Sequence, residues 1–216
     1  AYSEIYHQNI DIQYDRRKQY RGGLGYNFIN NPKPVRPFNR IKMFQGKAFT
    51  IIKDFNFYYM PKMFSFRTDM NRQYNEKLLR NKSEALIILE PTYIKMWDWN
   101  RIYDLKYDLA QSLKLEYQAN ANAYVNEPPG RIDRNLDDYQ ARKDSIWDEV
   151  MNFGTMNRFT QNFSLNYVLP INKIPLFNWV TLNTRYNSTF RWDASPISIQ
   201  EIMGNTIENS NTVNIN

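Results

Sequence analysis

The chain has 216 residues, with 28 Lys and Arg against 22 Asp and Glu, a net charge of +6 and no cysteine. The lack of cysteine excludes disulfides, thiol catalysis and Cys-based metal sites, and the basic residues are too scattered for a nucleic-acid-binding stripe. Aromatic residues make up 16% of a chain whose mean hydropathy is only −0.70. Because disordered chains are poor in aromatics, we expect β-structure with one hydrated face and one apolar face.

The sequence predicts no membrane helix. It also has the features of a fragment of a longer protein. The longest clean apolar run, Ala85–Leu89, is far shorter than the about 18 residues that a membrane helix needs. There is no signal peptide and no initiator Met, and the final NTVNIN has the pattern of a strand cut midway. We therefore expect an internal fragment of a longer protein.

The first third of the chain alternates apolar and polar residues, which predicts strands. This pattern covers NIDIQYD (residues 9–15), GLGYNF (residues 23–28) and FSFRTDMNRQYNE (residues 64–76). Residues 31–63 interrupt it with a non-strand insertion that is rich in Pro and Lys at its start. The middle of this insertion, GKAFTIIKDF (residues 46–55), favours a helix.

The longest alternation runs from Trp97 to Val125. A single strand of this length would extend roughly 95 Å at about 3.3 Å per residue. We therefore expect a hairpin that turns at residues 110–112, with strands near residues 95–109 and 113–125.

A helix-containing loop is predicted over residues 126–157. Apolar and long side chains form one stripe there, between the EPPG at residues 127–130 and Gly154. The stripe consists of Leu136, Tyr139, Lys143, Ile146, Trp147 and Val150. Two further strands follow, within residues 159–169 and 179–192, separated by a shorter connection at residues 170–178 and followed by a long one at residues 193–212.

Short turns that alternate with long loops are typical of outer-membrane barrels. The predicted fold class is therefore all-β: an antiparallel up-and-down transmembrane β-barrel segment, an open fragment of a much larger barrel, with one or two short loop helices. Residues 1–216 would form part of a single large barrel domain. About thirteen residues at ~3.3 Å each, tilted by ~40°, span roughly 33 Å, enough for an apolar band and its aromatic girdles.

The two faces of the predicted wall differ in chemistry. Aromatic side chains suit lipid and its interfaces, because a phenol or indole ring has one apolar and one hydrogen-bonding end. The lipid-facing or girdle residues are predicted to be Trp97, Trp99, Tyr103, Tyr107, Tyr117, Trp179, Tyr186 and Trp192. The charges on the other face would be costly in a dry core, which favours a wide hydrated lumen. The lumen-facing residues are predicted to be Asp98, Asp104, Lys106, Asp108, Lys114, Glu116, Asn183 and Arg185.

Catalytic chemistry has little support in the sequence. His7 is the only histidine, so a metal site or a histidine-based triad is not expected. The GGLG at residues 22–25 lacks the Lys-Ser/Thr of a phosphate-binding loop. We predict no enzyme activity, no cofactor and no metal. A soluble β-sandwich that binds carbohydrate through exposed Tyr and Trp stays open as an alternative.

Long motifs resemble one known family. The segment IKDFNFYYMPKMFSFRTDMNRQYNE (residues 52–76) resembles the SprA (Sov) family, the giant outer-membrane barrels of the type IX secretion system in Bacteroidetes. The resemblance continues through WDWNRIYDLKYDLAQSLKLEY, NEPPGRID and GNTIENSNTVNIN and covers nearly the whole chain.

The resemblance implies a part of a protein-conducting channel, linked to gliding motility, that exports folded cargo proteins carrying a C-terminal secretion domain. It also implies an outer-membrane location, contact with the lipid bilayer, and two protein partners: an outer-membrane barrel shuttle and a periplasmic plug. No nucleic acid is expected. With short turns facing the periplasm, residues 110–112, 170–178 and 31–63 would be periplasmic, and residues 126–157 and 193–212 extracellular. Another outer-membrane barrel, a porin or substrate receptor, is the nearer alternative.

Overall fold

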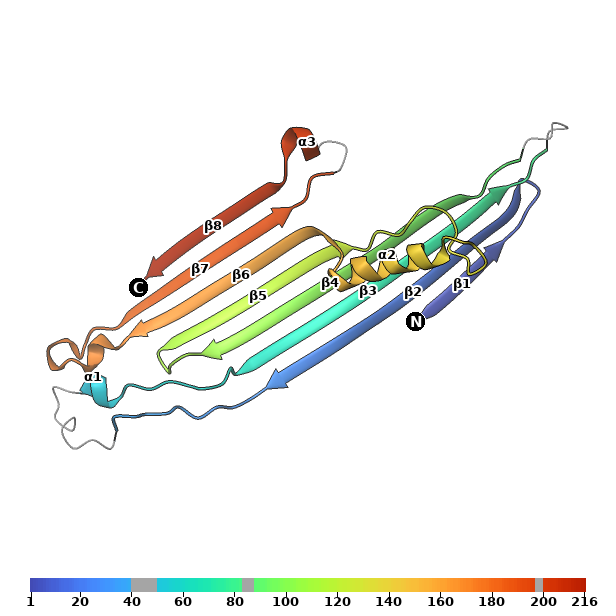
Figure 1. Ribbon diagram of the computed structural model, residues 1–216. Coiled ribbons are helices and arrows are strands. Elements are labelled where there is room, and N and C mark those ends of the chain that lie inside the picture. The colour runs from blue at the N-terminus through green and yellow to red at the C-terminus, as the bar shows by residue number, and fades with distance from the viewer. Residues whose placement is uncertain (40–49, 83–87, 197–199) are drawn as a thin grey trace. The chain divides into compact units, whose positions relative to one another are not determined.

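The computed structural model describes residues 1–39, 50–82, 88–196 and 200–216 (Figure 1). Its strands are β1 (Tyr2–His7), β2 (Ile12–Ile29), β3 (Met63–Leu79), β4 (Thr92–Asp108), β5 (Leu113–Tyr124), β6 (Thr155–Leu169), β7 (Leu182–Asp193) and β8 (Thr206–Ile215). Its α-helices are α1 (Thr50–Lys53), α2 (Tyr139–Met151) and α3 (Gln200–Met203), and its 3₁₀ turns are η3 (Pro170–Lys173) and η4 (Pro175–Phe177).

Within the described residues, the eight strands form one antiparallel sheet in sequence order (Figure 1). At one edge, β1 pairs with β2 from Tyr2↔Tyr20 to His7↔Asp15. At the other, β7 pairs with β8 from Thr184↔Ile215 to Asp193↔Thr206. The sheet is not closed, because β1 and β8 each have one neighbour. The prediction of an all-β, antiparallel, up-and-down sheet is confirmed.

The hairpin between β4 and β5 turns where the sequence predicts. Ala110 and Leu113 exchange two backbone hydrogen bonds of 3.0 and 3.2 Å, which leaves Gln111 and Ser112 at the tip. The Gln111 N–H donates to Asn56 Oδ1 at 2.8 Å, so the insertion before β3 supports the turn. This side-chain contact replaces the Asn-Gly chemistry that such turns usually require.

Three sequence predictions need correction. The connection predicted over residues 193–212 is shorter, because β7 continues to Asp193 and β8 begins at Thr206. Trp179 precedes β7 instead of starting it. The helix predicted at residues 46–55 corresponds only to α1, over Thr50–Lys53, and residues 46–49 lie outside the described part of the chain. The predicted helix between β5 and β6 corresponds to α2.

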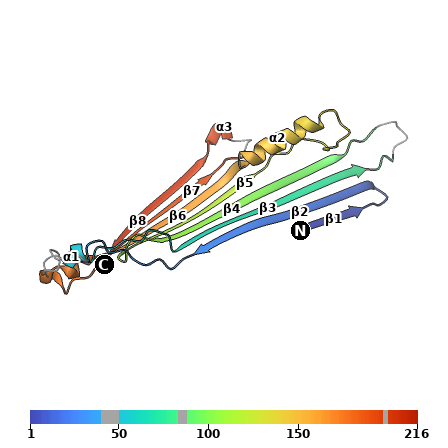
Figure 2. The same ribbon diagram turned by 60° about the horizontal axis from the view of Figure 1, so that its bottom comes forward.

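The chain divides into two compact units. Unit 1 comprises Ala1–Leu24, Thr68–Arg101 and Ala121–Arg158, and unit 2 comprises Gly25–Arg67, Ile102–Asn120 and Phe159–Asn216. In unit 1, α2 stands over one face of the strands (Figure 2). Among the described residues, the buried hydrophobic side chains are few: Trp99, Ala119, Ala121, Ala123 and Val125. The described strands all belong to one sheet, so no second sheet packs on their aromatic residues.

Candidate functional site

Aromatic rings of neighbouring strands meet on one face of unit 2. Phe66 of β3 lies 5.1 Å from Tyr103 of β4, between ring centroids. Phe163 of β6 lies 6.1 Å from Tyr186 of β7. Cross-strand aromatic pairs at these distances stabilise a sheet beyond the area that they bury. Aromatic rings therefore pair between neighbouring strands at two places on this face.

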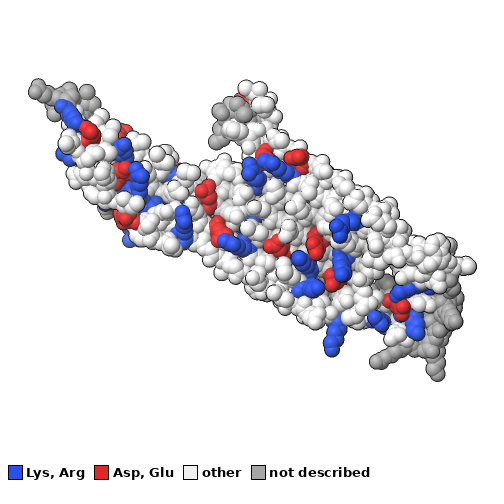
Figure 3. Space-filling model, turned by 180° about the vertical axis from the view of Figure 1, so that it is seen from behind, with Lys and Arg blue, Asp and Glu red and all other residues white. Residues whose placement is uncertain are grey.

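Polar side chains meet on the other face of unit 2. Ser164 Oγ donates to Asn187 Oδ1 at 2.8 Å, and Arg185 Nε donates to Asn166 Oδ1 at 2.6 Å. These residues alternate with Phe163 and Tyr186 along β6 and β7, and side chains alternate between faces along a strand. Figure 3, viewed from behind relative to Figure 1, shows Lys and Arg interspersed with Asp and Glu. In unit 2, the alternation seen in the sequence is thus a separation of two chemical faces.

The exposures of the predicted lumen-facing residues suit a wet face. Asp104 and Asp108 are half-buried, and the following residues are exposed: Asp98, Lys106, Lys114, Glu116, Asn183 and Arg185. Lys106 Nζ lies 3.9 Å from Glu116 Oε1, with both side chains about half exposed. A pair this exposed contributes little to stability, at most about 1 kcal/mol. Water reaches these charged side chains, so the folded protein pays little desolvation free energy for them.

The predicted lipid-facing or girdle residues fall into three environments. Trp179 is exposed, and the half-buried members are Trp97, Tyr103, Tyr107, Tyr117, Tyr186 and Trp192. The Tyr107 hydroxyl donates to the backbone oxygen of Tyr58 at 2.8 Å, and the Tyr117 hydroxyl donates to Gln161 at 3.2 Å. Trp99 is only 8% exposed, so little of its ring is left for lipid. Whether the others contact lipid stays a prediction.

Trp99 belongs to an aromatic and cationic cluster in unit 1. Its indole N–H donates to Thr68 Oγ1 at 2.7 Å. The Arg101 guanidinium lies 4.9 Å from the Trp99 ring and 5.3 Å from the ring of Phe153, which follows α2. Arg101 is buried, and its Nε has no hydrogen-bond partner among the described residues. Contact of the cation with two ring faces offsets part of the cost of burying it.

A buried ion pair fastens the connection after β5 to the sheet. Arg72 of β3 donates two hydrogen bonds to Glu127, from Nε at 2.6 Å and from Nη2 at 2.7 Å. The Glu127 side chain is only 2% exposed. Next to it, Lys95 Nζ donates to the Pro128 carbonyl at 2.6 Å. The bidentate geometry fixes orientation as well as distance, so residues 127–128 have one position on the strands.

The connection rejoins the sheet through a left-handed turn. Phe153 has a φ of 64° and Gly154 a φ of 71°, a region that non-glycine residues rarely adopt. This turn directs the Phe153 ring to Trp99, at 5.9 Å between centroids. A Cβ on Gly154 would lie 2.8 Å from the Tyr124 carbonyl oxygen. Glycine is therefore required here for both its conformation and its small size.

Gly154→Ala is expected to destabilise the connection by about 1–3 kcal/mol, because the new Cβ adds a backbone clash to a strained φ. Faster amide hydrogen exchange in residues 150–156 would measure the change. Gly22→Ala is the matched control, since no atom lies within 4 Å of its added Cβ. Equal exchange in both variants would contradict this account of the turn.

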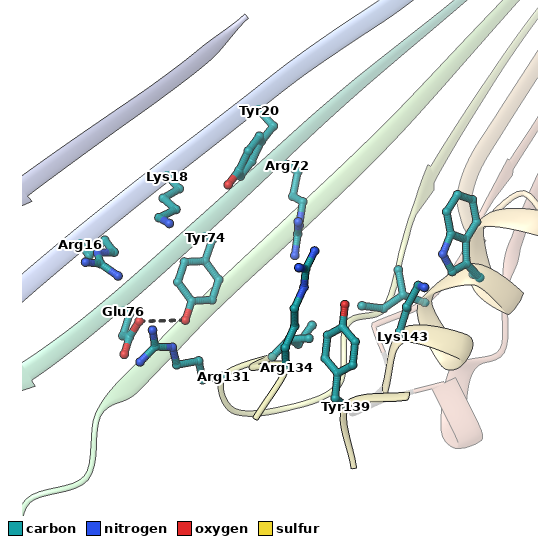
Figure 4. Close-up of a pocket in the computed structure, with 13 residues that line it drawn as sticks. Arg16, Lys18, Tyr20, Arg72, Tyr74, Glu76, Arg131, Arg134, Tyr139 and Lys143 are labelled. Atoms are coloured by element: carbon teal, nitrogen blue, oxygen red, sulfur yellow. Dashed lines mark hydrogen bonds between the residues drawn. The ribbon is translucent and has the colours of Figure 1, made fainter. Parts of the chain in front are cut away.

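A basic and aromatic cleft of about 410 Å³ lies in unit 1 between the strands and the α2 segment (Figure 4). Its lining residues come from β2, β3, the loop before α2, and α2 itself. The cationic ones are Arg16, Lys18, Arg72, Arg131, Arg134 and Lys143. Glu76 is the carboxylate of the lining, and it accepts hydrogen bonds from the Tyr14 and Tyr74 hydroxyls, both at 3.0 Å. The cleft is therefore rich in hydrogen-bond donors and positive charge.

The sequence alone does not predict this cleft. The lining residues come from segments more than 50 positions apart, and the densest run of charge among them, DRRK at residues 15–18, is too short to indicate a binding site by itself. One available signal was the series Arg16, Lys18 and Tyr20. By alternation these residues lie on the same face of their strand as Tyr26 and Phe28, so cations precede aromatic residues on that face. Period-two alternation places these residues together but does not reveal the loop that covers them.

In unit 2, a further ion pair joins two connections. Lys173 Nζ of η3 donates to Asp54 Oδ2 at 2.8 Å, next to α1. The hydrogen bond from Lys173 holds the pKa of the Asp54 carboxyl below its usual range, with smaller contributions from Arg36 and Lys53. This contact is therefore kept at neutral pH, and it would be lost only as the pH falls through that lowered pKa.

No helix in the described part of the chain has the length and apolar character to cross a membrane. Among the described residues, no group of three or more His, Cys, Asp or Glu side chains is placed to hold a metal ion. The chain matches no protein-family model, and no curated protein is significantly similar to it.

Proposed function

We propose that this chain forms part of the wall of the outer-membrane protein-conducting channel of the type IX secretion system. The observation that carries the proposal is a single unclosed up-and-down sheet with an aromatic face, a charged and amide face, and no second sheet on either within the described residues. The resemblance to the SprA family supplies the identity of the system. In the alternative, another outer-membrane barrel, the chain would form the same kind of wall but would not export these cargo proteins.

The described strands form one sheet with no second sheet packed on it, which bears on the soluble alternative. A β-sandwich buries its inner face against another sheet about 10 Å away. Here large apolar side chains stay exposed on the aromatic face, among them Tyr26, whose ring lies 6.3 Å from that of Phe64, and Val213, which pairs with Tyr186. Exposed apolar side chains gathered on one face mark an interaction site, and a bilayer is one partner that can cover them.

The open edges point the same way. Every residue of β8 is exposed, and its outer backbone groups have no strand partner in the sheet. Within a bilayer such groups must be paired, since each unsatisfied one costs several kcal/mol. Further strands of the same wall would pair with β1 and β8, which favours a barrel larger than these strands alone could make.

The polar face suits a passage for proteins. Charges of both signs and amides keep water bound, so a folded cargo would meet no apolar surface on its way. The proposed role is transport without catalysis. The proposed partners are cargo with a C-terminal secretion domain, the barrel shuttle and the periplasmic plug, and no residue is assigned to the shuttle or to the plug.

Site-directed spin labelling of β4 in the full-length protein tests the wall. Because this chain has no cysteine, single cysteines at Asp104, Leu105, Lys106 and Tyr107 can each carry a nitroxide in reconstituted vesicles, once any cysteine elsewhere in the full-length protein is replaced. We expect lipid-soluble oxygen to relax the labels at 105 and 107, and a water-soluble nickel chelate to relax those at 104 and 106. Equal accessibility at all four positions would refute a wall between lipid and water.

A photo-crosslinker at Lys106 separates a protein channel from a porin. During export, it should capture a secreted protein with a C-terminal secretion domain. Small-solute conductance without any captured cargo would favour the porin or receptor.

A further inference from the structure

We propose that the cleft between the strands and α2 in unit 1 binds a phosphorylated sugar. This inference is independent of the proposed channel, because it rests on the lining of the cleft alone. The volume of about 410 Å³ is within the 300–1,000 Å³ of ordinary small-molecule sites. Such sites combine aromatic walls with a few convergent polar groups, and both are present here.

Apart from Arg72, which is paired with Glu127, the cations of the cleft are incompletely neutralised. Arg16 and Lys18 share one carboxylate, that of Glu4, at 3.5 and 3.7 Å. Arg131 Nε lies 3.8 Å from Asp133. Each of these contacts is long for a charge-assisted hydrogen bond, which is about 2.7–2.9 Å. These three cations therefore keep donors for another anion.

Arg134 and Lys143 have no carboxylate within ion-pair distance among the described residues. In Figure 4 the Arg134 side chain points toward that of Arg72. The Arg72 guanidinium is already paired with Glu127, so the donors left for another anion at this point are those of Arg134. Because guanidinium donors match phosphate oxygens in pairs, a phosphate is the anion that best fits this arrangement.

Glu76 does not compete for these cations as a free carboxylate would. Both of its oxygens accept tyrosine hydroxyls, and the residue is only 3% exposed. It therefore anchors the Tyr74 ring in the lining. A second aromatic surface is offered by Trp147 of α2, which is 52% exposed, and a third by Tyr139.

These rings suit a sugar. Tyrosine and tryptophan present an apolar face to the C–H side of a pyranose, and a polar end to its hydroxyls. The remaining arginine and lysine donors can satisfy further hydroxyl oxygens. A sugar phosphate thus uses the charge and the rings of the cleft together, whereas inorganic phosphate uses the charge alone.

The same chemistry has two sources: a soluble sugar phosphate, or the phosphorylated glucosamine headgroup of a membrane glycolipid. Binding of a phosphorylated glucosamine disaccharide to the detergent-purified full-length protein can be measured by calorimetry, with and without acyl chains. Equal affinity for both forms would indicate a soluble ligand, and binding only of the acylated form a lipid headgroup. The unphosphorylated disaccharide should bind at least tenfold more weakly.

The double variant Arg134→Gln with Lys143→Gln removes the two unpaired cations from an exposed loop and helix surface. We expect it to weaken the phosphorylated ligand at least tenfold while the melting temperature stays unchanged. Lys33→Gln with Lys114→Gln removes the same charge from exposed positions outside the cleft and should bind as the parent does. The proposal is overturned by unchanged binding in the first double variant, by equal loss in the second, or by inorganic phosphate or adenosine monophosphate binding as tightly as the disaccharide.

Discussion

Replacing Leu105 with arginine is expected to reduce assembly of the protein into the outer membrane several-fold. Leu105 lies between Tyr103 and Tyr107 in the alternating series of β4, on the face where Phe66 meets Tyr103. An arginine exposed to the apolar interior of a bilayer costs a barrel strand about 2–4 kcal/mol. The amount of folded protein in outer-membrane fractions, separated from unfolded chains by heat-modifiable electrophoresis, measures this loss.

The neighbouring polar positions provide the control. Asp104→Asn and Lys106→Gln change charge on the opposite face, where Lys106 lies 3.9 Å from Glu116 in water. Each should leave assembly within about twofold of the parent, because an exposed ion pair contributes at most about 1 kcal/mol. If the two faces were equally sensitive, the assignment of lipid to the aromatic face would be wrong.

The sequence predicts the sheet well where alternation is strong. In β4, β6 and β7 large aromatic residues alternate with charges or amides, and register follows from such a pattern because a slip of one residue exchanges the faces. The hairpin at Ala110 and Leu113 was found from a lapse in the same pattern. The two edge strands were harder to find. β8 carries Ile207, Val213 and Ile215 among polar residues, so its period is weak, and residues 193–212 were predicted as a loop for that reason.

The packing of Phe153 over Trp99 could not be predicted from the two-residue alternation alone. Alternation says which face a side chain occupies but not what lies over that face. Phe153 contacts Trp99 from 54 residues further along the chain, and it does so through two consecutive left-handed residues. The positive φ of Phe153 has no sequence signature, although the Gly154 after α2 was recognised as the end of a helix. The basic cleft was missed for the same reason, since its lining depends on where the connection lies.

That connection should depend most on Arg72. Removing one partner of a buried ion pair leaves an uncompensated charge, at a cost of about 3–5 kcal/mol. Arg72→Met would leave the Glu127 carboxylate, 2% exposed, without its two hydrogen bonds. Because Arg72 itself is 29% exposed, some water would reach the vacated place, so we expect the lower end, about 3 kcal/mol. If the free energy of local opening of residues 126–135 falls by about 3 kcal/mol, amide hydrogen exchange in this segment becomes faster on the order of 100-fold.

Two further variants separate the buried charge from simple loss of contacts. Adding Glu127→Gln to Arg72→Met removes the stranded charge, so exchange in residues 126–135 should return most of the way to the parent level. Arg191→Met breaks an ion pair with Asp193 whose arginine is 48% exposed, and it should change exchange near Asp193 less than about fivefold. If the double variant exchanges as fast as Arg72→Met alone, the stabilisation comes from the stacking of Arg72 on Trp97, 5.2 Å away, and not from its pairing with Glu127.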